Sequence, residues 1–416
     1  MTHSILRPAL INKARHSLLR PVFLGLVSLT ALLHSCATTE IVTANSTPPV
    51  QLASSISDSD RVDILVVPFN PNLDALTQAN QGDIPISADV RRAESRYLAF
   101  HLKDTLEQTG NWGIVRVVPA PADHHAVTVT GTIIESDGEQ LHAEVVAKDA
   151  TGRVWFSRSY QDIASKYGYQ SLQEDPFQDF YNEIANDLVR AYQSLSSSDV
   201  RQIQQVANLQ FAANLAPLAF EGYLSATKRG DVTINQLPAA NDASMLRVNR
   251  LRAQDDLLTD TVDDFYFKFY RDIKPSYDEW RYATYDEAIR LRQMNKQARN
   301  RLLTGAALIA GGIYAGSQSE TWAADAASAG AVMGGVTAIK SGLDRRQQTE
   351  IHEQALQELT QSLSLEIAPN VLDIEGETRE LTGSAERQYS AWREILADIY
   401  REERGLNQTT EGALTP

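Results

Sequence analysis

Cysteine is almost absent from this chain of 416 residues, which contains a single one, Cys36. One cysteine excludes an internal disulfide, and it excludes a zinc site built from several cysteine ligands. It also leaves the rest of the chain without a cysteine nucleophile. A lone cysteine in a large protein is normally a small buried residue, but Cys36 closely follows an apolar run, so its position points to a different role.

Basic residues are also in short supply. The chain has 38 Lys and Arg against 53 Asp and Glu, which gives a formal net charge of −15. Four of the basic residues precede Cys36, where no acidic residue occurs, so the remainder of the chain is more acidic still. An acidic surface repels the phosphate backbone, and no cluster of Lys and Arg reverses this locally. The sequence therefore predicts no nucleic-acid partner.

The sequence lacks the short motifs of common catalytic sites. It contains no GxSxG, HExxH, P-loop or GxGxxG pattern. His124 and His125 are adjacent, and neighbouring residues of a strand point to opposite faces, so we expect loop histidines rather than two ligands of one metal ion. His101 falls within a helical pattern and is expected at the surface or its boundary. These observations favour a protein that is not an enzyme and has no metal site and no cofactor.

The first 35 residues have the layout of a secretory signal. Residues 1–20 carry scattered cations without acids, and an apolar run follows that is too short for a permanent membrane span. The four residues that end at Cys36, LHSC, resemble the lipobox of bacterial lipoprotein precursors. The match lies at Leu33, Ser35 and Cys36, while His34 departs from the family, where a small or apolar residue is usual.

This resemblance implies a lipid anchor. It implies cleavage before Cys36, a diacylglycerol on its sulfur and acylation of the new amino group, and three acyl chains anchor a protein stably. Ala37 follows in place of the Asp that tends to retain such proteins in the inner membrane, which implies the outer membrane. Residues 36–60 are rich in Ser, Thr and Ala and are typical of a flexible tether. We therefore expect a periplasm-facing protein held at the outer membrane.

Residues 61–165 predict an α/β domain. A buried strand in RVDILVVPFN is followed by a helix ending before Gly110, a strand in WGIVRVVP, and three strands joined by the tight turns SDG and ATG. This β-α-β-β-β order, with VVPF, TVTGTII and TGRVWFSRSY in those places, resembles a family of envelope domains. The family includes penicillin-binding-protein activator lipoproteins, the amino-terminal domain of the Tol-system propeller protein and the curli-secretion lipoprotein. The resemblance implies a partner-binding domain without catalysis, and no functional residue is carried over.

Residues 166–300 predict a mainly helical domain. It begins with Asp175-Pro176, a helix cap and first-turn pair, and it pauses at Lys274-Pro275. Nine aromatic residues occur between 265 and 285, which favours burial against a neighbouring domain and leaves open a stacking surface for glycans. Five nearby carboxylates could also supply a glycosidase pair, with a solvated face as the default. They are Asp263, Asp264, Asp272, Asp278 and Glu279.

Residues 301–344 predict a helical hairpin. LLTGAALIAGGIYAG (302–316) and AADAASAGAVMGGVTAIKSGL (323–343) both place small residues four apart, the spacing of a glycine-zipper seam. The predicted seam residues are Ala307, Gly311, Gly312, Ala315, Gly316, Ala326, Gly330, Gly334 and Gly335. A helix of fifteen residues covers about 22 Å, which is less than the ~30 Å hydrocarbon core of a bilayer. The hairpin is therefore either buried in protein, including between subunits of a homo-oligomer, or dips into one leaflet.

The rest of the chain completes the expected architecture. Residues 345–404 predict a helix, two extended segments and a final helix with Trp392 inward, and residues 405–416 predict a disordered tail. The fold class is thus α+β, a small β-α-β-β-β domain followed by a mainly helical domain with a glycine-zipper hairpin. The expected function is a lipid-anchored, non-enzymatic scaffold or activator that binds an unknown envelope protein. The alternatives are a hydrolase of peptidoglycan or another glycan, and a subunit of an envelope secretion or channel assembly.

Overall fold

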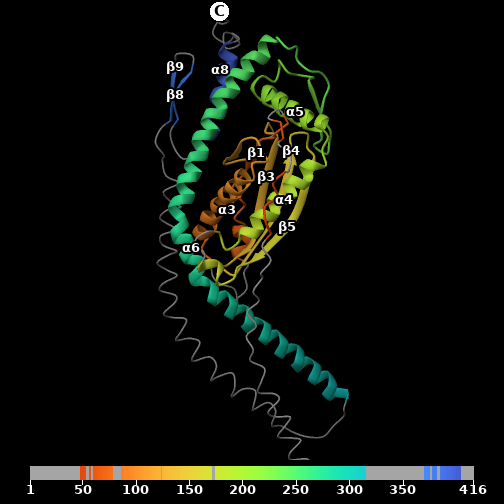
Figure 1. Ribbon diagram of the computed structural model, residues 1–416, viewed down its shortest axis with the longest axis vertical. Helices are drawn as coiled ribbons and strands as arrows, with labels where there is room; N and C mark the ends of the chain where they lie inside the picture. Colours follow the sequence, from red (N-terminus) through yellow and green to blue (C-terminus); the bar gives the residue numbers. More distant parts are fainter. Residues whose placement is uncertain are drawn as a thin grey trace, which may run out of the picture. The chain divides into compact units, whose positions relative to one another are not determined.

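The computed structural model describes residues 47–52, 56–57, 60–77, 86–122, 124–170, 174–314, 370–374, 377–381 and 385–403. All of these residues belong to one compact unit. A five-stranded sheet occupies the first part of the described chain, and helices dominate after it (Figure 1). The predicted fold class, α+β with a β-α-β-β-β unit before a mainly helical part, is confirmed.

The sheet has the spatial order β2-β1-β3-β4-β5. Its strands are β1 (Ile64–Val66), β2 (Val115–Val117), β3 (Val127–Ser136), β4 (Gln140–Asp149) and β5 (Val154–Ile163). β1 is parallel to both β2 and β3, and the last three strands form the predicted antiparallel meander. The two meander turns contain Gly138 and Gly152, both at φ +90°, a conformation that favours glycine.

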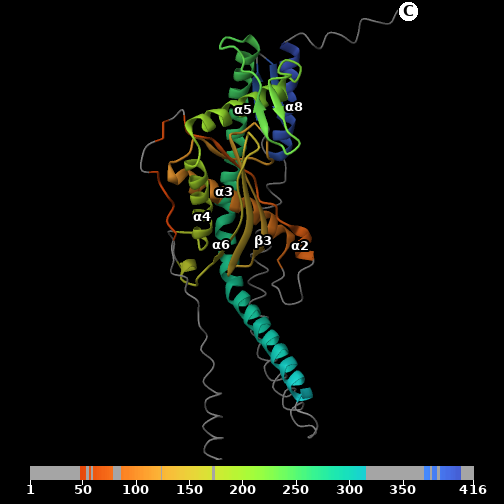
Figure 2. The ribbon, with the colours of Figure 1, turned by 90° about the vertical axis from the view of Figure 1, so that its right-hand side faces the viewer.

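Helices α3 (Ala88–Thr109) and α4 (Gln178–Gln193) cover the apolar face of the sheet. The Ser87 hydroxyl caps α3 by accepting from Val90 N, and Gly110 ends it at φ +67°. Alternate residues of β3 and β4 are buried beneath these helices, as period-2 patterning requires. The short helix α2 (Leu73–Thr77) lies on the other side of β3 from α4 in Figure 2.

The chain continues through α5 (Ser197–Leu215), which begins with a capping box between Ser196 and Asp199. A small hairpin of β6 (Leu224–Ala226) and β7 (Val232–Ile234) follows. The hairpin turn contains Gly230 at φ +88°, and Val232 N donates to the Thr151 carbonyl of the β4–β5 turn. The contact with the β4–β5 turn stabilises this hairpin. Such a contact between distant segments cannot be read from local propensity.

Helix α6 (Ala243–Tyr314) is continuous over 72 residues and includes Pro275. The predicted pause at Lys274-Pro275 is therefore wrong, and so is the predicted end near residue 301. A proline removes one intrahelical hydrogen bond, but Ile273 and Tyr277 on either side of it are buried, so packing holds the helix together. α6 packs against α3, β2, α5 and the last helix, α8 (Ala385–Glu403).

Two short strands, β8 (Asn370–Ile374) and β9 (Glu377–Leu381), form the predicted extended pair before α8. In α8, Trp392 is fully buried and Ile399 nearly so, as predicted. Among the described residues, no helix has an apolar stretch long enough to cross a membrane.

The sheet and the helical part share one hydrophobic core. Buried side chains connect without interruption from Val62, before β1, to Tyr400 in α8. The change in secondary structure near residue 165 is therefore not a division between two separate cores. This shared packing positions the cleft described next.

Candidate functional site

A cleft of about 890 Å³ lies between the second half of α3, the start of α4 and the middle of α6. Its walls come from segments that are far apart in the sequence, and Gly168 and Tyr169 of the 3₁₀ turn η1 (Gly168–Gln170) also line it. Six carboxylates and one lysine line it, together with tyrosine and amide side chains. We call it the acidic cleft. The six carboxylates are those of Asp104, Glu174, Asp175, Asp278, Glu279 and Asp286.

One wall of the acidic cleft is the aromatic segment of α6. Tyr266, Tyr277 and Trp280 are buried at the helical spacing that faces α3, which confirms the prediction of packing for these rings. Tyr97 of α3 lies 4.6 Å from Tyr277 and 4.8 Å from Tyr270, centroid to centroid. Tyr282 remains 48% exposed at the cleft. Most of the aromatic residues are thus core, and a few line the cleft.

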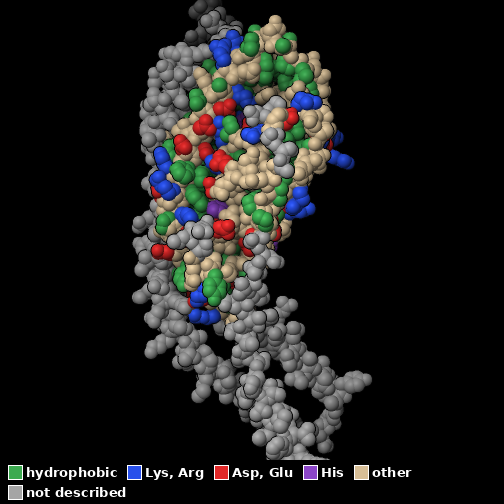
Figure 3. Space-filling model, viewed as in Figure 1, with side chains coloured by type: hydrophobic (Ala, Val, Ile, Leu, Met, Phe, Trp, Pro, Cys, Tyr) green, Lys and Arg blue, Asp and Glu red, His purple; other side chains and the backbone are tan. Residues whose placement is uncertain are grey.

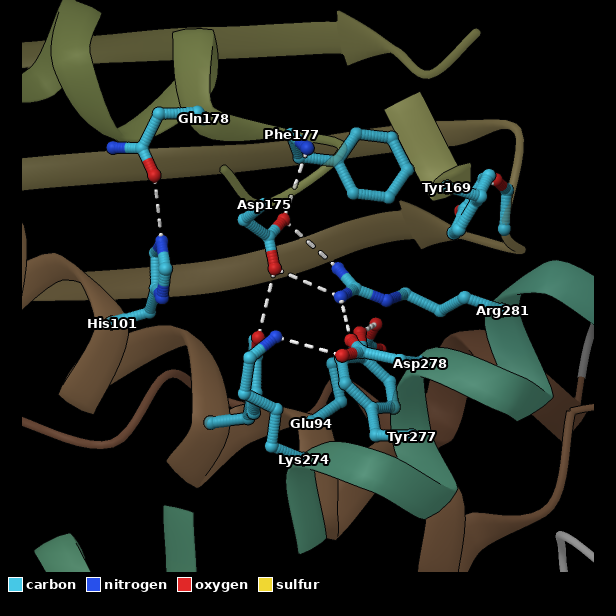
Figure 4. Close-up of polar contacts among 12 residues, drawn as sticks. Glu94, His101, Tyr169, Asp175, Phe177, Gln178, Lys274, Tyr277, Asp278 and Arg281 are labelled. Carbon is cyan, nitrogen blue, oxygen red and sulfur yellow. Dashed lines mark hydrogen bonds and ion pairs between the residues drawn. The ribbon is translucent and has the colours of Figure 1, made fainter. Parts of the chain in front are cut away.

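A fully buried ion pair joins α6 to the segment before α4. Arg281 Nη1 and Nη2 donate to the two oxygens of Asp175 at 3.0 and 2.8 Å (Figure 4). The Tyr97 hydroxyl donates to Asp175 at 2.8 Å, and Phe177 N donates at 2.9 Å. Burial alone would raise the pKa of the Asp175 carboxyl, but the Arg281 guanidinium holds this pKa well below its usual value. The carboxylate is charged, and it fixes the start of α4 against α6.

The role of Asp175 differs from the sequence prediction. α4 begins at Gln178, not directly after Asp175, and the Asp175 carboxylate is directed toward Arg281. An N-cap and a buried ion-pair partner share the same residue type, so the sequence alone does not distinguish them. Arg281 lies within the aromatic segment of residues 265–285, and nothing in its spacing indicates a partner 106 residues away.

A second buried carboxylate lies below the ion pair. Glu94 of α3 is fully buried and accepts a hydrogen bond from the Tyr277 hydroxyl at 2.5 Å. It also accepts from the Ser136 hydroxyl, and Arg91 lies 3.2 Å away. These contacts join α3, the end of β3 and α6 into one rigid base beneath the cleft.

His101 lies in the cleft wall and is only 7% exposed, so it is a satisfied boundary residue. Its Nε2 is 2.9 Å from Gln178 Oε1 and its Nδ1 is 2.7 Å from the Tyr270 hydroxyl. Because the amide oxygen is an acceptor, Nε2 carries a proton, and in the neutral ring Nδ1 accepts from Tyr270. The ring therefore links α3, α4 and α6 by hydrogen bonds.

Charge is unevenly distributed at the mouth of the cleft. Lys274 donates to Asp278 at 2.7 Å, and Asp278 also contacts Arg281, so these charges are largely compensated. Asp104, Glu174, Glu279 and Asp286 add four further carboxylates to the lining, and Asp286 is paired with Lys166 at 3.4 Å. Acidic side chains also gather in the middle of the face drawn in Figure 3. The lining of the cleft thus contains more acidic than basic side chains.

The five carboxylates predicted as possible glycosidase residues are spread apart. Only Asp278 and Glu279 line the cleft. Asp263 instead accepts from Val117 N at 2.7 Å and contacts Lys103 at 3.2 Å, so it ties α6 to the edge of the sheet. Asp272 is on the surface and pairs with Arg271.

The two predicted loop histidines lie in the turn before β3, and His124 is buried. The prediction of a turn is correct, but these residues are not ordinary solvent-exposed loop histidines. His124 contacts Arg393 of α8, which the sequence could not indicate. Within the described residues, no three His, Cys, Asp or Glu side chains are grouped as metal ligands would be.

The other predicted site residues are only partly covered by the structure. Ala307, Gly311 and Gly312 lie in the last turns of α6, so this part of the predicted seam is helical. The lipid-attachment residue Cys36, the sorting residue Ala37 and the rest of the seam lie outside the described residues. Those remaining seam residues are Ala315, Gly316, Ala326, Gly330, Gly334 and Gly335.

Two comparisons with known proteins complete the description of the site. No model of a known protein family matches the sequence, and no curated protein sequence matches it either.

Proposed function

We propose that this protein is a lipid-anchored, periplasm-facing scaffold or activator of the bacterial envelope, and that its acidic cleft holds a basic segment of a partner protein. The cellular location rests on the lipobox at Cys36 and on the tether that follows it. The binding role rests on the cleft.

The observation that carries the binding role is the excess of carboxylates around a rigid base. Six carboxylates and one lysine line the cleft. Asp175, Asp278 and Asp286 are paired with basic side chains, and the remaining carboxylates attract a Lys- or Arg-bearing segment that enters the cleft. The Asp175–Arg281 ion pair and the buried Glu94 hold the walls in place. A preformed site loses little entropy when the partner binds, which favours affinity.

Tyrosine side chains in the cleft add a second kind of contact. Tyr282 is half-exposed at the rim, and an aromatic face attracts a Lys or Arg side chain by a cation–π interaction. The same rings could stack on a sugar, which is the contact expected of the glycan-hydrolase alternative. The two proposals therefore share a cleft but differ in the ligand and in whether that ligand is cleaved.

The test is a binding measurement on the full mature chain in detergent. A fluorescent ten-residue peptide rich in Lys and Arg is titrated, and the anisotropy is read at low and at physiological salt. The variant Asp104→Asn/Glu279→Gln removes two charges from the cleft, and we expect roughly 3- to 30-fold weaker binding. Salt should weaken binding to the unaltered chain more than binding to the variant.

The matched control is Glu144→Gln/Glu394→Gln, which removes two exposed charges from β4 and α8, outside the cleft. Equal losses of affinity in both double variants would contradict the proposal, because net charge and not the cleft would then drive binding. Incubation with peptidoglycan fragments forms the second arm. Cleavage of those fragments would replace the scaffold by the hydrolase alternative.

A further inference from the structure

A second cavity, of about 280 Å³, lies at the amino ends of β1, β2 and β3, where α5 and α6 cover the sheet. It is far from the acidic cleft. Arg252 of this cavity and Asp278 of the cleft are 26 residues apart in α6, a separation of about 39 Å along a helix. We call it the arginine pocket, because three arginines line it in a protein that is otherwise acidic. They are Arg61, Arg116 and Arg252.

Arg252 is the central residue of the arginine pocket. Its guanidinium donates to Asn208 Oδ1 at 2.6 Å and to the His124 carbonyl at 3.3 Å, and both of these acceptors are uncharged. It also lies over the ring of Phe211, 5.3 Å from the centroid. Burial lowers the pKa of this guanidinium, and the nearby charges of Asp256, Asp255 and Asp63 oppose that shift. None of these carboxylates is a hydrogen-bond partner of Arg252, so a bound anion would supply the charged acceptor that Asn208 and the His124 carbonyl do not.

His125 supplies a second, independent observation. Its Nε2 is buried and has no hydrogen-bond partner within the described residues, and the residue lines the pocket. A buried polar atom without a partner is costly and calls for a ligand or water. Burial, followed by the neighbouring Arg252, lowers the pKa of His125 to about 3, so the ring is neutral. With its proton on Nε2, the ring has one hydrogen bond to donate to a ligand.

The carboxylates of the pocket are already engaged. Asp63 accepts a hydrogen bond from Ile114 N at 2.7 Å, and Asp256 pairs with Arg116 at 3.0 Å. Arg116 also bonds Asp260 through Nε at 2.6 Å, which leaves its Nη2 without a hydrogen-bond partner in the described part of the chain. The amides of Gln204 and Asn208 complete a polar lining.

We infer that the arginine pocket binds a compact oxyanion, the phosphate or carboxylate group of a small ligand, through Arg252, Arg116 and His125. Guanidinium groups bind both kinds of oxyanion by charge-assisted hydrogen bonds. The cavity volume lies just below the ~300 Å³ at which ordinary ligand pockets begin, which favours a small ligand over a nucleotide or a chain of sugars. This site is independent of the acidic cleft and of the function proposed for it.

The experiment measures anion binding to the full mature chain in detergent. Inorganic phosphate and malonate are the two probes, each titrated at constant ionic strength against sodium chloride. Thermal unfolding is followed, because a ligand that binds only the folded state raises the midpoint. We expect phosphate or malonate to raise the midpoint temperature of unfolding above its value in sodium chloride. The probe that does so shows whether the pocket prefers a phosphate or a carboxylate.

The variants are Arg252→Gln and, as a control on the same helix, Arg271→Gln, an exposed residue paired with Asp272. Arg252→Gln should weaken binding roughly 10- to 100-fold, and Arg271→Gln should leave it unchanged. Phosphorus-31 line broadening of phosphate by the unaltered chain, with malonate competing for the same site, gives a measurement that requires no variant. The inference is overturned if neither probe differs from chloride, or if both variants respond like the unaltered chain.

Discussion

The best-defined group of side chains in this protein is the buried ion pair of Asp175 and Arg281. Both side chains are fully buried, and Arg281 is also packed between the rings of Tyr97, Tyr277 and Phe177. Two charges in such a place are tolerated only because each satisfies the other. The pair therefore determines how α4 and α6 meet, and it shapes one wall of the acidic cleft.

Asp175→Asn should lower the free energy of unfolding by about 3 kcal/mol or more, because it leaves a buried guanidinium without its main counter-charge. Urea unfolding followed by circular dichroism measures the change. The double variant Asp175→Asn/Arg281→Met removes both charges and should recover part of the loss. A double variant less stable than Asp175→Asn alone would show that the charge balance is not what matters here.

Asp162, at the end of β5, should make stability depend on pH. Burial raises its pKa to about 6, although Ile163 N and Phe180 N donate to it. An unfolded Asp has a pKa near 3.9, so the folded chain binds the proton more tightly, and the contribution of Asp162 becomes less favourable as pH rises from about 4 to 6. The neutral variant Asp162→Asn does not carry this penalty.

We compare the free energies of unfolding of Asp162→Asn and the unaltered chain. Between pH 4 and pH 7.5 the difference should change by about 1–2 kcal/mol in favour of the variant, a range that takes the partial exposure of Asp162 into account. Urea unfolding of both proteins at the two pH values provides the measurement. Any hydrogen bond lost in the variant contributes equally to the stability difference at both pH values. Only the change of that difference with pH therefore tests the assignment. A difference that is the same at pH 4 and pH 7.5 would refute this assignment.

Among the elements, the β3–β4 turn and α6 depend on each other most closely. Gly138 lies at φ +90°, and a Cβ built there would come within 2.4 Å of the Arg281 carbonyl oxygen. On the next turns of α6, Arg292 pairs with three carboxylates of the same hairpin, those of Glu135, Asp137 and Glu139. The turn is thus one of the points at which the sheet contacts the long helix, together with the edge strand β2.

Gly138→Ala should destabilise the protein by about 2–5 kcal/mol, since it combines an unfavourable backbone conformation with a contact too close for a methyl group. Gly222→Ala is the matched control, because Gly222 lies at φ +80° with no atom within 4 Å of the added Cβ. It should cost only about 1–2 kcal/mol. Chemical unfolding of both variants separates the two effects, and equal losses would mean that α6 does not press on the turn.

At the scale of the whole molecule, the helical part completes the fold of the sheet. α6 covers the edge strand β2, where Asp263 accepts from Val117 N. α8 packs against α6, and Trp392 Nε1 donates to the buried Asp255 at 3.1 Å. Covering an edge strand in this way prevents that strand from pairing with other chains.

A flotation experiment tests membrane contact by the Gly- and Ala-rich segment. The chain of residues 37–416, made without the lipidated cysteine, is mixed with liposomes and compared with a variant lacking 302–343. If the segment is buried in protein, neither should float, and both should stay soluble. Flotation of the longer chain alone would make the segment a second membrane anchor and favour the secretion or channel alternative.

The sequence by itself determined most of the secondary structure of the α/β part. Period-2 alternation in β3 and β4, the leucines four apart in α3, and the glycines at 110, 138 and 152 place these elements correctly, because each signal is local. It also predicted that most of the aromatic residues of α6 are buried. The lipid anchor at Cys36 and the hairpin seam remain predictions of the sequence alone.

Only the tertiary structure decided which contacts the helical part makes. Pro275 stays within α6, Asp175 is an ion-pair partner and not simply a cap, and His124 is buried against α8, because in each case a distant segment supplies the deciding contact. The acidic cleft and the arginine pocket both lie where segments separated by a hundred residues or more meet. A linear pattern records what each residue prefers locally, whereas a site depends on which residues the shared core brings together.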